Sequence, residues 1–155
     1  MISSRSVSVT SLSTSYLLDP ARLFALDRLD LLDSPPEPAY DRLTNMAVRL
    51  LNVPVALMTL VDRDRQFFKS QVGLGEPWAS ARETPLSHSF CQYVVAQQKQ
   101  LVVADARNDA VLATNLAIPD LGVIAYAGVP LRSPDGAVIG SFCAIDTQPR
   151  VWTDE

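Results

Sequence analysis

The stretch that decides the fold is IAYAGVPLRSPDGAVIGSFCAID, residues 124–146. Two apolar runs, 124–131 and 137–145, lie on either side of the sequence SPDG at 133–136. Proline presets φ at the second position of a turn and Asp-Gly accepts the positive φ that follows, so the two runs are predicted to form a β-hairpin. Neither run alternates between apolar and polar residues, which indicates strands covered on both faces at the centre of a sheet.

Small residues are concentrated in this hairpin. They are Ala125, Ala127, Gly128, Gly140 and Ser141. A strand built from small side chains lets another group lie close to its backbone, so we expect a helix or a small ligand to pack there. The hairpin itself carries no evident catalytic group.

The composition is that of a folded protein in a reducing environment. The chain has 155 residues, of which 48 % are hydrophobic, enough for one domain that buries about two-thirds of its unfolded surface. Its net charge of −4 argues against nucleic acid or an anionic membrane as partner. No apolar run reaches the roughly 18 residues of a membrane helix, and the Ser-rich residues 1–16 lack the apolar core of a secretion signal. We therefore expect a cytoplasmic protein with a flexible tail at 1–16 and two free thiols.

Two helices are predicted before the first strand. Leucines at helical spacing extend from residue 17 to Leu32, and Asp19-Pro20 supplies an N-cap and a proline in the first turn. The second helix is predicted from about Pro38 to Leu51, with an apolar stripe that faces the core. The residues of that stripe are Tyr40, Leu43, Ala47, Leu50 and Leu51.

The remaining strands are short apolar runs, at 55–61, 66–72 and 101–104. A loop is predicted over 73–84, followed by a third helix over 86–97 with Ser87 or Thr84 as its cap. The connection 105–122 is predicted to be irregular, with one or two helical turns. The sequence after Trp152 has the pattern of a helix start, with Thr as N-cap and acidic residues behind it.

Five phrases of the sequence resemble GAF domains, and more narrowly those at the front of bacterial histidine kinases and diguanylate cyclases. The phrases are ALDRLDLLDSPPEPAYDRLT (25–44), VPVALMTLVDRDRQFFKSQVGL (53–74), ETPLSHSFCQYVV (83–95), LVVADARNDAVLATN (101–115) and YAGVPLRSPDGAVIGSFCAIDTQPR (126–150). The resemblance implies an α+β fold with a central antiparallel sheet of five to six strands and helices on both sides. We expect the GAF domain over 17–150 and the start of a C-terminal linker helix over 151–155.

The resemblance also implies a function. GAF domains commonly sense small molecules in a pocket between the sheet and the connections that lead into the hairpin, and they pass the state on through terminal helices. We therefore expect a regulatory domain rather than an enzyme, in a homodimer whose output is a kinase or cyclase domain. Two alternatives remain: a ligand-free dimerisation module that pairs through residues 17–32 and the helix expected after Trp152, and a thiol-based redox sensor that uses Cys91.

The residues predicted to line the pocket are aromatic, polar or thiol side chains near these connections. They are Phe68, Trp78, His88, Phe90, Cys91, Asp105, Arg107, Asp109, Tyr126 and Cys143. Phe67 and Phe68 should point to opposite faces of their strand, so that only one of them reaches the pocket. Cys143 lies in an apolar strand, where a buried hydrophobic role is expected. Cys91 lies early in the third helix, where a thiolate is favoured.

The acidic run DARND at 105–109 has two interpretations. Asp105, Arg107 and Asp109 would lie at the mouth of the pocket, with Arg107 available to an anionic ligand. In the structural alternative, which we favour, Asp105 caps the turn after the strand and Arg107 pairs with a carboxylate.

No metal, haem or bilin cofactor is expected, and the sequence leaves the ligand unidentified. His88 and Cys91 are spaced as two metal ligands, but the whole sequence has only three Cys or His side chains, and a structural zinc site needs four. In bilin-binding GAF domains a histidine typically follows the attachment cysteine, whereas Gln92 follows Cys91 here. The cysteine set of the GAF-type methionine sulfoxide reductases and the signature of cyclic-nucleotide-binding GAF domains are not matched.

Overall fold

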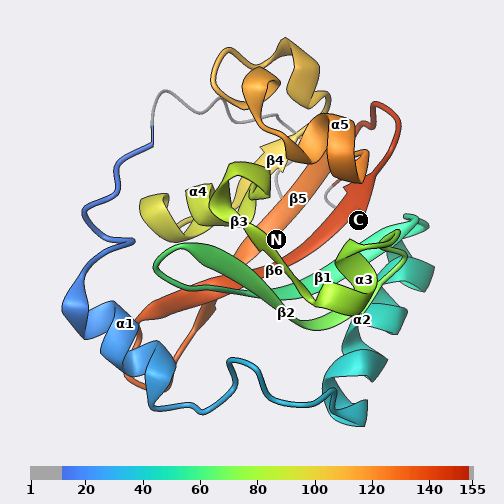
Figure 1. Ribbon diagram of the computed structural model, residues 1–155. Coiled ribbons are helices and arrows are strands. Elements are labelled where there is room, and N and C mark those ends of the chain that lie inside the picture. Colours follow the sequence, from blue (N-terminus) through green and yellow to red (C-terminus); the bar gives the residue numbers. More distant parts are fainter. Residues whose placement is uncertain (1–11, 154–155) are drawn as a thin grey trace.

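The computed structural model describes residues 12–153 (Figure 1). Its strands are β1 (Val55–Val61), β2 (Arg65–Val72), β3 (Glu83–Pro85), β4 (Leu101–Val103), β5 (Ala125–Arg132) and β6 (Val138–Asp146). Its helices are α1 (Pro20–Asp27), α2 (Pro38–Leu51), α3 (Trp78–Ala81), α4 (Cys91–Gln97) and α5 (Ala117–Leu121), with 3₁₀ turns η1 (Leu86–His88), η2 (Ala106–Asn108) and η3 (Leu112–Thr114). Within these residues the strands form one antiparallel sheet in the order β3-β2-β1-β6-β5-β4. The predicted α+β architecture is confirmed.

The predicted hairpin lies at the centre of this sheet. Strands β5 and β6 pair antiparallel, and β6 also pairs with β1. In the turn, Gly136 N donates to the carbonyl of Ser133 at 2.8 Å, and Gly136 adopts a φ of 91°. The SPDG sequence therefore forms the predicted turn.

Two glycines of the hairpin leave space that other parts of the chain fill. A Cβ on Gly140 would lie 1.9 Å from the carbonyl oxygen of Thr59, so β6 approaches β1 closely only because residue 140 has no side chain. A Cβ on Gly128 would lie 2.4 Å from the hydroxyl of Tyr126. At these two positions the neighbouring strand and the Tyr126 ring occupy the space in which we expected a helix or ligand.

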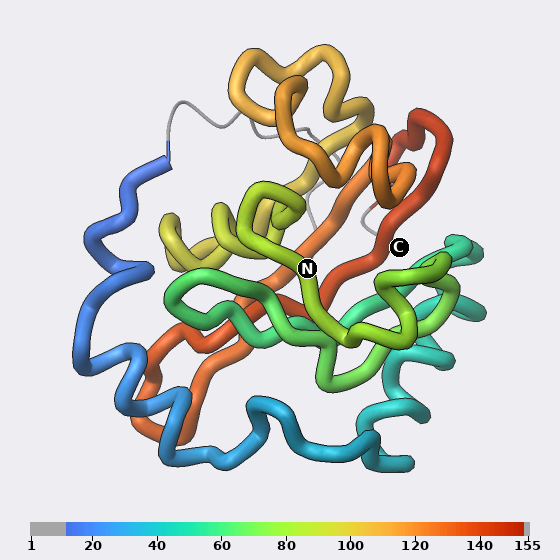
Figure 2. The backbone as a smooth tube through the Cα atoms, viewed as in Figure 1, coloured from blue at the N-terminus to red at the C-terminus, as the bar shows by residue number. Residues whose placement is uncertain are grey.

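Helices cover both faces of the sheet, as predicted. Helix α4 packs on the face that carries Leu57, Tyr126 and Cys143, whereas α2 packs on the opposite face, beside Ala127 and Ala144. Helix α1 lies along the turn end of the β5–β6 hairpin, which Figure 2 shows as the blue segment beside the orange strands. None of the helices in the described part of the chain is both long and apolar enough to cross a membrane.

The ends of two helices differ from the prediction. Helix α1 begins as predicted, with Asp19 Oδ1 accepting from Ala21 N at 2.8 Å, but it ends at Asp27 rather than Leu32. Positive φ values at Asp30 and Asp33 turn the chain, so the leucines after α1 reach the core from loops. Helix α4 begins at Cys91 rather than residue 86, because the extended residue Ser89 separates it from η1. The Ser89 hydroxyl, and not Ser87 or Thr84, accepts from the backbone of the first turn.

The predicted apolar stripe of α2 is wrong at Leu43 and Leu50, which expose 47 % and 76 % of their surface. Ala47 of that stripe is buried, and Tyr40 and Leu51 are half-buried. Thr44, outside the predicted stripe, is buried against the sheet, where its hydroxyl lies 2.7 Å from that of Ser70.

Both termini of the described chain are tied to the core. Tyr16, within the predicted tail, accepts a 2.8 Å hydrogen bond from Val138 N through its hydroxyl. Trp152 is buried and its indole donates to the carbonyl of Val103 at 2.9 Å. Residues 1–11 of the predicted tail and residues 154–155 of the predicted linker helix lie outside the described residues.

We expect Gly140→Ala to destabilise the protein by about 3 kcal/mol, the upper end of what overpacking costs, because its Cβ would meet the backbone of β1. Gly75→Ala is the matched control, since no atom lies within 4 Å of the added Cβ, and its effect should stay below about 1 kcal/mol. Urea unfolding measures both. Equal stability of the two variants would contradict the close approach of β6 to β1.

Candidate functional site

A small cavity lies between the sheet, α4 and α5, where the ligand pocket was predicted. Four of the predicted residues line it: His88, Phe90, Cys91 and Tyr126. Apolar side chains complete the lining, from Leu57, Ala117, Leu121, Val123 and Ile145. The cavity has a volume of about 10 Å³, which is close to the minimum space for one water molecule.

Polar contacts hold the cover of this cavity in place. His88 Nε2 lies 2.7 Å from Asp120 Oδ2 on α5, and His88 Nδ1 lies 2.9 Å from the hydroxyl of Ser87. Asn115, just before α5, donates through its amide to the carbonyl of Ser89 at 3.0 Å. Trp78 stacks on the His88 ring with 5.1 Å between centroids. The cover is thus attached by hydrogen bonds at its rim, including one from Leu116 N to the carbonyl of Ser87 at 3.0 Å, and by the apolar side chains of Ala117 and Leu121 on its inner side.

Gln66 brings an unsatisfied polar atom to the cavity. Its side chain is buried, and its amide nitrogen donates to the hydroxyl of Thr84 at 2.8 Å and to the carbonyl of His88 at 3.1 Å. Its carbonyl oxygen Oε1 is buried and has no hydrogen-bond partner among the described residues. A buried acceptor in a cavity lining favours a donor from water or ligand, because leaving it unpaired costs free energy.

Two thiols meet beside the cavity. The sulfur atoms of Cys91 and Cys143 are 3.9 Å apart, and both side chains are buried. The Tyr126 hydroxyl donates to Cys91 Sγ at 3.2 Å and lies 3.0 Å from the hydroxyl of Ser141. Thr59, fully buried on β1, also contributes a hydroxyl beside Cys91. The Cys91 sulfur therefore lies among three hydroxyls and a second thiol.

These surroundings separate the acidities of the two thiols. Burial raises the pKa of Cys91, but the hydrogen bonds with Cys143 and Tyr126, together with the nearby hydroxyls of Thr59 and Ser141, outweigh it and lower this pKa to about 7. Burial, together with the neighbouring Cys91, raises the pKa of Cys143 well above its usual value. Because the two thiols share one buried site, the pair carries at most one negative charge near neutral pH, and Cys91 is the more acidic member.

The other predicted residues lie at different distances from the cavity. Phe68 and Cys143 belong to the same core cluster, and Trp78 reaches the site only through His88. Asp105 Oδ1 accepts from the backbone N of Arg107 at 3.0 Å and from its Nε at 2.9 Å, while Arg107 is exposed. Asp109 Oδ1 accepts from two backbone N–H groups after it. The capping by Asp105 and its ion pair with Arg107 are the contacts expected from the structural interpretation of residues 105–109.

The prediction missed Thr59, Gln66 and Ser141. Thr59 and Ser141 are polar residues inside strands that otherwise read as apolar, and that exception was the available signal. Gln66 lies in a strand with several other polar residues and had no such signal. Asp120 was missed because nothing in the sequence pairs it with His88, 32 positions earlier. Among the described residues, no three His, Cys, Asp or Glu side chains are grouped to hold a metal ion.

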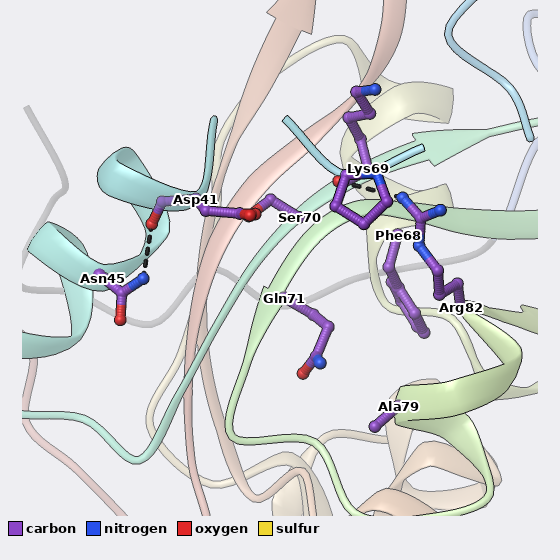
Figure 3. Close-up of a pocket in the computed structure, with 9 residues that line it drawn as sticks. Asp41, Asn45, Phe68, Lys69, Ser70, Gln71, Ala79 and Arg82 are labelled. Atoms are coloured by element: carbon purple, nitrogen blue, oxygen red, sulfur yellow. Dashed lines mark hydrogen bonds between the residues drawn. The ribbon is translucent and has the colours of Figure 1, made fainter. Parts of the chain in front are cut away.

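A second, larger pocket of about 300 Å³ lies at the β2 edge of the sheet, between α2 and α3 (Figure 3). Its polar groups are already engaged by the protein. Asp41 accepts from the Ser70 hydroxyl at 2.6 Å, and Arg82 donates to the carbonyl of Ser34 at 2.9 Å. Lys69 donates to Ser34 and to the carbonyl of Pro35. These contacts fasten residues 34–37 to the sheet, which is a structural role.

Comparisons with known proteins agree with this architecture. The sequence model of the GAF domain matches residues 35–155. The cyclic di-GMP phosphodiesterase PA2567 of Pseudomonas aeruginosa is 32% identical over 126 residues, which are 81% of this chain and 21% of that protein. The chain thus spans about a fifth of the length of this curated relative.

Solved structures share the fold at low identity. The GAF domain of an Acinetobacter phosphoenolpyruvate-protein phosphotransferase superposes with a TM-score of 0.60 at 17% identity, over 88% of this chain and 84% of that chain. A domain of a putative sensor histidine kinase from Sinorhizobium meliloti gives 0.56 at 21% identity, over 75% and 77%. The free methionine-R-sulfoxide reductase of Neisseria meningitidis gives 0.56 at 18% identity, over 97% and 86%.

We expect Tyr126→Phe to raise the pKa of Cys91 above about 7, because it removes a hydroxyl that donates to the sulfur. Tyr93→Phe is the matched control, since Tyr93 is buried in the same cluster but gives no bond to either thiol. The rate of thiol alkylation as a function of pH measures the shift. A profile that Tyr126→Phe leaves unchanged would contradict the assignment.

The lowered pKa also predicts a pH dependence of stability. The folded pKa of Cys91, about 7, lies below the ordinary value of 9.0 in the unfolded chain. The unfolded state therefore binds more protons between these pH values, and the free energy of unfolding should rise as pH increases from 7 to 9. This stabilisation should be lost as pH falls through 7, and Cys91→Ser should abolish the rise.

Proposed function

The chain belongs to the GAF domain family, and from that premise we propose that it is a sensory domain of a bacterial signalling protein. In this proposal it acts in the cytoplasm as a regulatory domain without catalytic activity of its own. A small molecule enters the cavity under α5 and changes the packing around it. This change in packing is passed to an output domain such as a kinase, cyclase or phosphodiesterase.

The observation that carries the proposal is the unpaired carbonyl oxygen of Gln66 at a cavity lined mainly by apolar side chains. Small-molecule sites are typically apolar cavities with a few placed polar groups. With a volume of about 10 Å³ the cavity is too small for a ligand of several atoms, so such a ligand requires α5 to move outward. A ligand with a hydrogen-bond donor for Gln66 and an apolar body for Leu121 and Val123 would satisfy this lining.

The attachment of α5 suits such a movement. The contacts of His88 with Asp120, of Asn115 with Ser89 and of Leu116 N with the Ser87 carbonyl are single hydrogen bonds at the rim, each with a net worth of about 1 kcal/mol. Opening must also expose Ala117 and Leu121, which pack on the core, and the ligand's apolar body would replace those contacts. A ligand that binds only the open arrangement would shift the population towards it by its difference in affinity for the two states.

A physical route leads from the cavity to the C-terminal end of the domain. Ile145 lines the cavity, and the next residue, Asp146, binds Arg150 Nη1 at 3.1 Å. Arg150 in turn donates to the carbonyls of Leu51 and Asn52, at the end of α2. A displacement of β6 at the cavity would therefore alter how the chain leaves the sheet and how α2 is held.

Native mass spectrometry of the protein purified from bacterial cytosol tests the proposal. We expect an added small mass that is lost on denaturation, and protection of residues 105–126 from hydrogen exchange when it is bound. Ala117→Leu, which fills the cavity, should lose the added mass, whereas Ala113→Leu on the exposed side of η3 should keep it. Two results together would contradict the proposal: a protein that carries no added mass, and hydrogen exchange at 105–126 that does not change when the small-molecule fraction of the same cytosol is added.

A dimerisation module is the second candidate, and the exposed face of α2 favours it. Leu43, Met46 and Leu50 recur at helical spacing on that face and are all exposed. The predicted pairing through residues 17–32 is less favoured, because Leu17, Leu23 and Leu26 are buried within their own chain.

We expect Met46→Glu with Leu50→Glu to convert a dimer to a monomer, because the two carboxylates would be desolvated in a helix pair. Gln148→Glu adds a carboxylate at an exposed site far along the sequence and should leave the dimer intact. Light scattering after size exclusion measures the mass. A wild-type chain that is monomeric at the same concentration would exclude this candidate.

A further inference from the structure

We propose that Cys91 and Cys143 form a buried dithiol that a hydroperoxide oxidises to an intramolecular disulfide, with Cys91 reacting first. The proposal rests on the function proposed above only for the route of access, which is the opening of α5. The chemistry itself follows from the groups around the two sulfur atoms.

The hydroxyls around Cys91 are arranged for an anion. Tyr126 donates to Cys91 Sγ at 3.2 Å, and Ser141 lies within 3.0 Å of the Tyr126 oxygen. The hydroxyl of Thr59 is fully buried beside the same sulfur, yet it makes no hydrogen bond with any of residues 12–153 in this neutral state. A neutral thiol is a weak acceptor, whereas a thiolate accepts several donors, so Thr59 gains a partner when Cys91 loses its proton.

Cys143 is placed to complete the reaction. Its sulfur is 3.9 Å from that of Cys91, in van der Waals contact. A disulfide bond is about 2.05 Å long, so the sulfur atoms must approach by roughly 2 Å. Cys143 stays protonated near neutral pH, because burial and the neighbouring Cys91 raise its pKa. The pair therefore has one nucleophile and one reserve thiol.

Two balanced steps describe the oxidation. In the first, the Cys91 sulfur attacks the terminal oxygen of ROOH, the O–O bond breaks, and the thiol proton goes to the leaving oxygen, giving Cys91–SOH and ROH. In the second, the Cys143 sulfur displaces that hydroxyl, and the hydroxyl leaves as water with the Cys143 proton. Two thiols and one hydroperoxide thus yield one disulfide, one alcohol and one water, and the hydroperoxide is the oxidant.

The route to Cys91 runs through the cavity. Cys91 lines the cavity together with Gln66 and Tyr126. Both cysteines are buried, so neither sulfur can be reached directly from the surface. The cavity, about 10 Å³, has room for one water-sized molecule. Hydrogen peroxide, the smallest hydroperoxide, is therefore favoured over bulky organic hydroperoxides unless α5 opens fully.

Intact mass after exposure of the full chain to hydrogen peroxide tests the proposal. The wild type should lose two hydrogens, and reduction by a small dithiol should restore them. Cys143→Ser should instead gain one oxygen at Cys91, trapped by dimedone, whereas Cys91→Ser should leave Cys143 unmodified. Cross-linked pairs of chains in place of the internal disulfide, a first oxygen on Cys143, or a native wild type that is inert while the denatured chain reacts would each overturn the proposal.

Two further variants separate the chemistry from the access route. Thr59→Val keeps the shape of the side chain but removes the hydroxyl, and should slow oxidation at pH 7 by roughly fivefold, the loss of thiolate when a pKa of about 7 rises by one unit. An unchanged rate would overturn the role of the hydroxyls. Asp120→Ala removes the contact with His88 and should speed oxidation. An unchanged rate in Asp120→Ala would overturn access through the opening of α5, and with it the opening of α5 in the proposed function. Disulfide formation in the wild type would still support the thiol chemistry.

Discussion

The close approach of β1 and β6 at Gly140 is the constraint on which the rest of the structure depends. Because residue 140 has no side chain, Thr59 lies directly opposite Ser141, and Leu57 opposite Cys143. On the other side of β6, Cys143 lies opposite Gly128, over which the Tyr126 ring folds back. Side chains two positions apart share a face of a strand, so these pairings bring Thr59, Tyr126 and Cys143 to the face covered by α4. The thiol site is thus a product of strand register.

The sequence predicted the fold where local chemistry decides it. The SPDG turn, the Asp19 cap and the β1–β2 pair were all predictable, because turn residues, caps and buried strands leave short-range patterns. The early end of α1 was not, since Asp30 and Asp33 adopt positive φ only because the leucines beside them reach the core that way. The orientation of α2 was missed in part, since Thr44 faces the sheet beside Ser70 while Leu43 and Leu50 face solvent, and no local pattern marks a hydroxyl pair between a helix and a strand.

The candidate site, like the fold, was predictable only where the sequence carries a local signal. His88, Cys91 and Tyr126 stand out as the kinds of residue that perform chemistry, and they do meet at one cavity. Their partners come from residues 59, 66, 120 and 141, which lie in other elements and have no sequence relation to them. Asp105 and Arg107, the most conspicuous polar residues of the connection, bind one another at its surface. Register and packing across the sheet, and not composition, select the members of the site.

The cavity and the thiol pair are coupled because Cys91 belongs to both. Bringing the two sulfur atoms within bonding distance requires α4 and β6 to approach, and both elements line the cavity under α5. A ligand in the cavity that resists this approach would disfavour the disulfide. By thermodynamic linkage, a ligand that disfavours the disulfide must itself bind less tightly to the oxidised domain, by the same factor. A domain that both binds a ligand in this cavity and forms this disulfide would therefore bind the ligand most tightly when its thiols are reduced. The ligand and the oxidant would not need to touch one another.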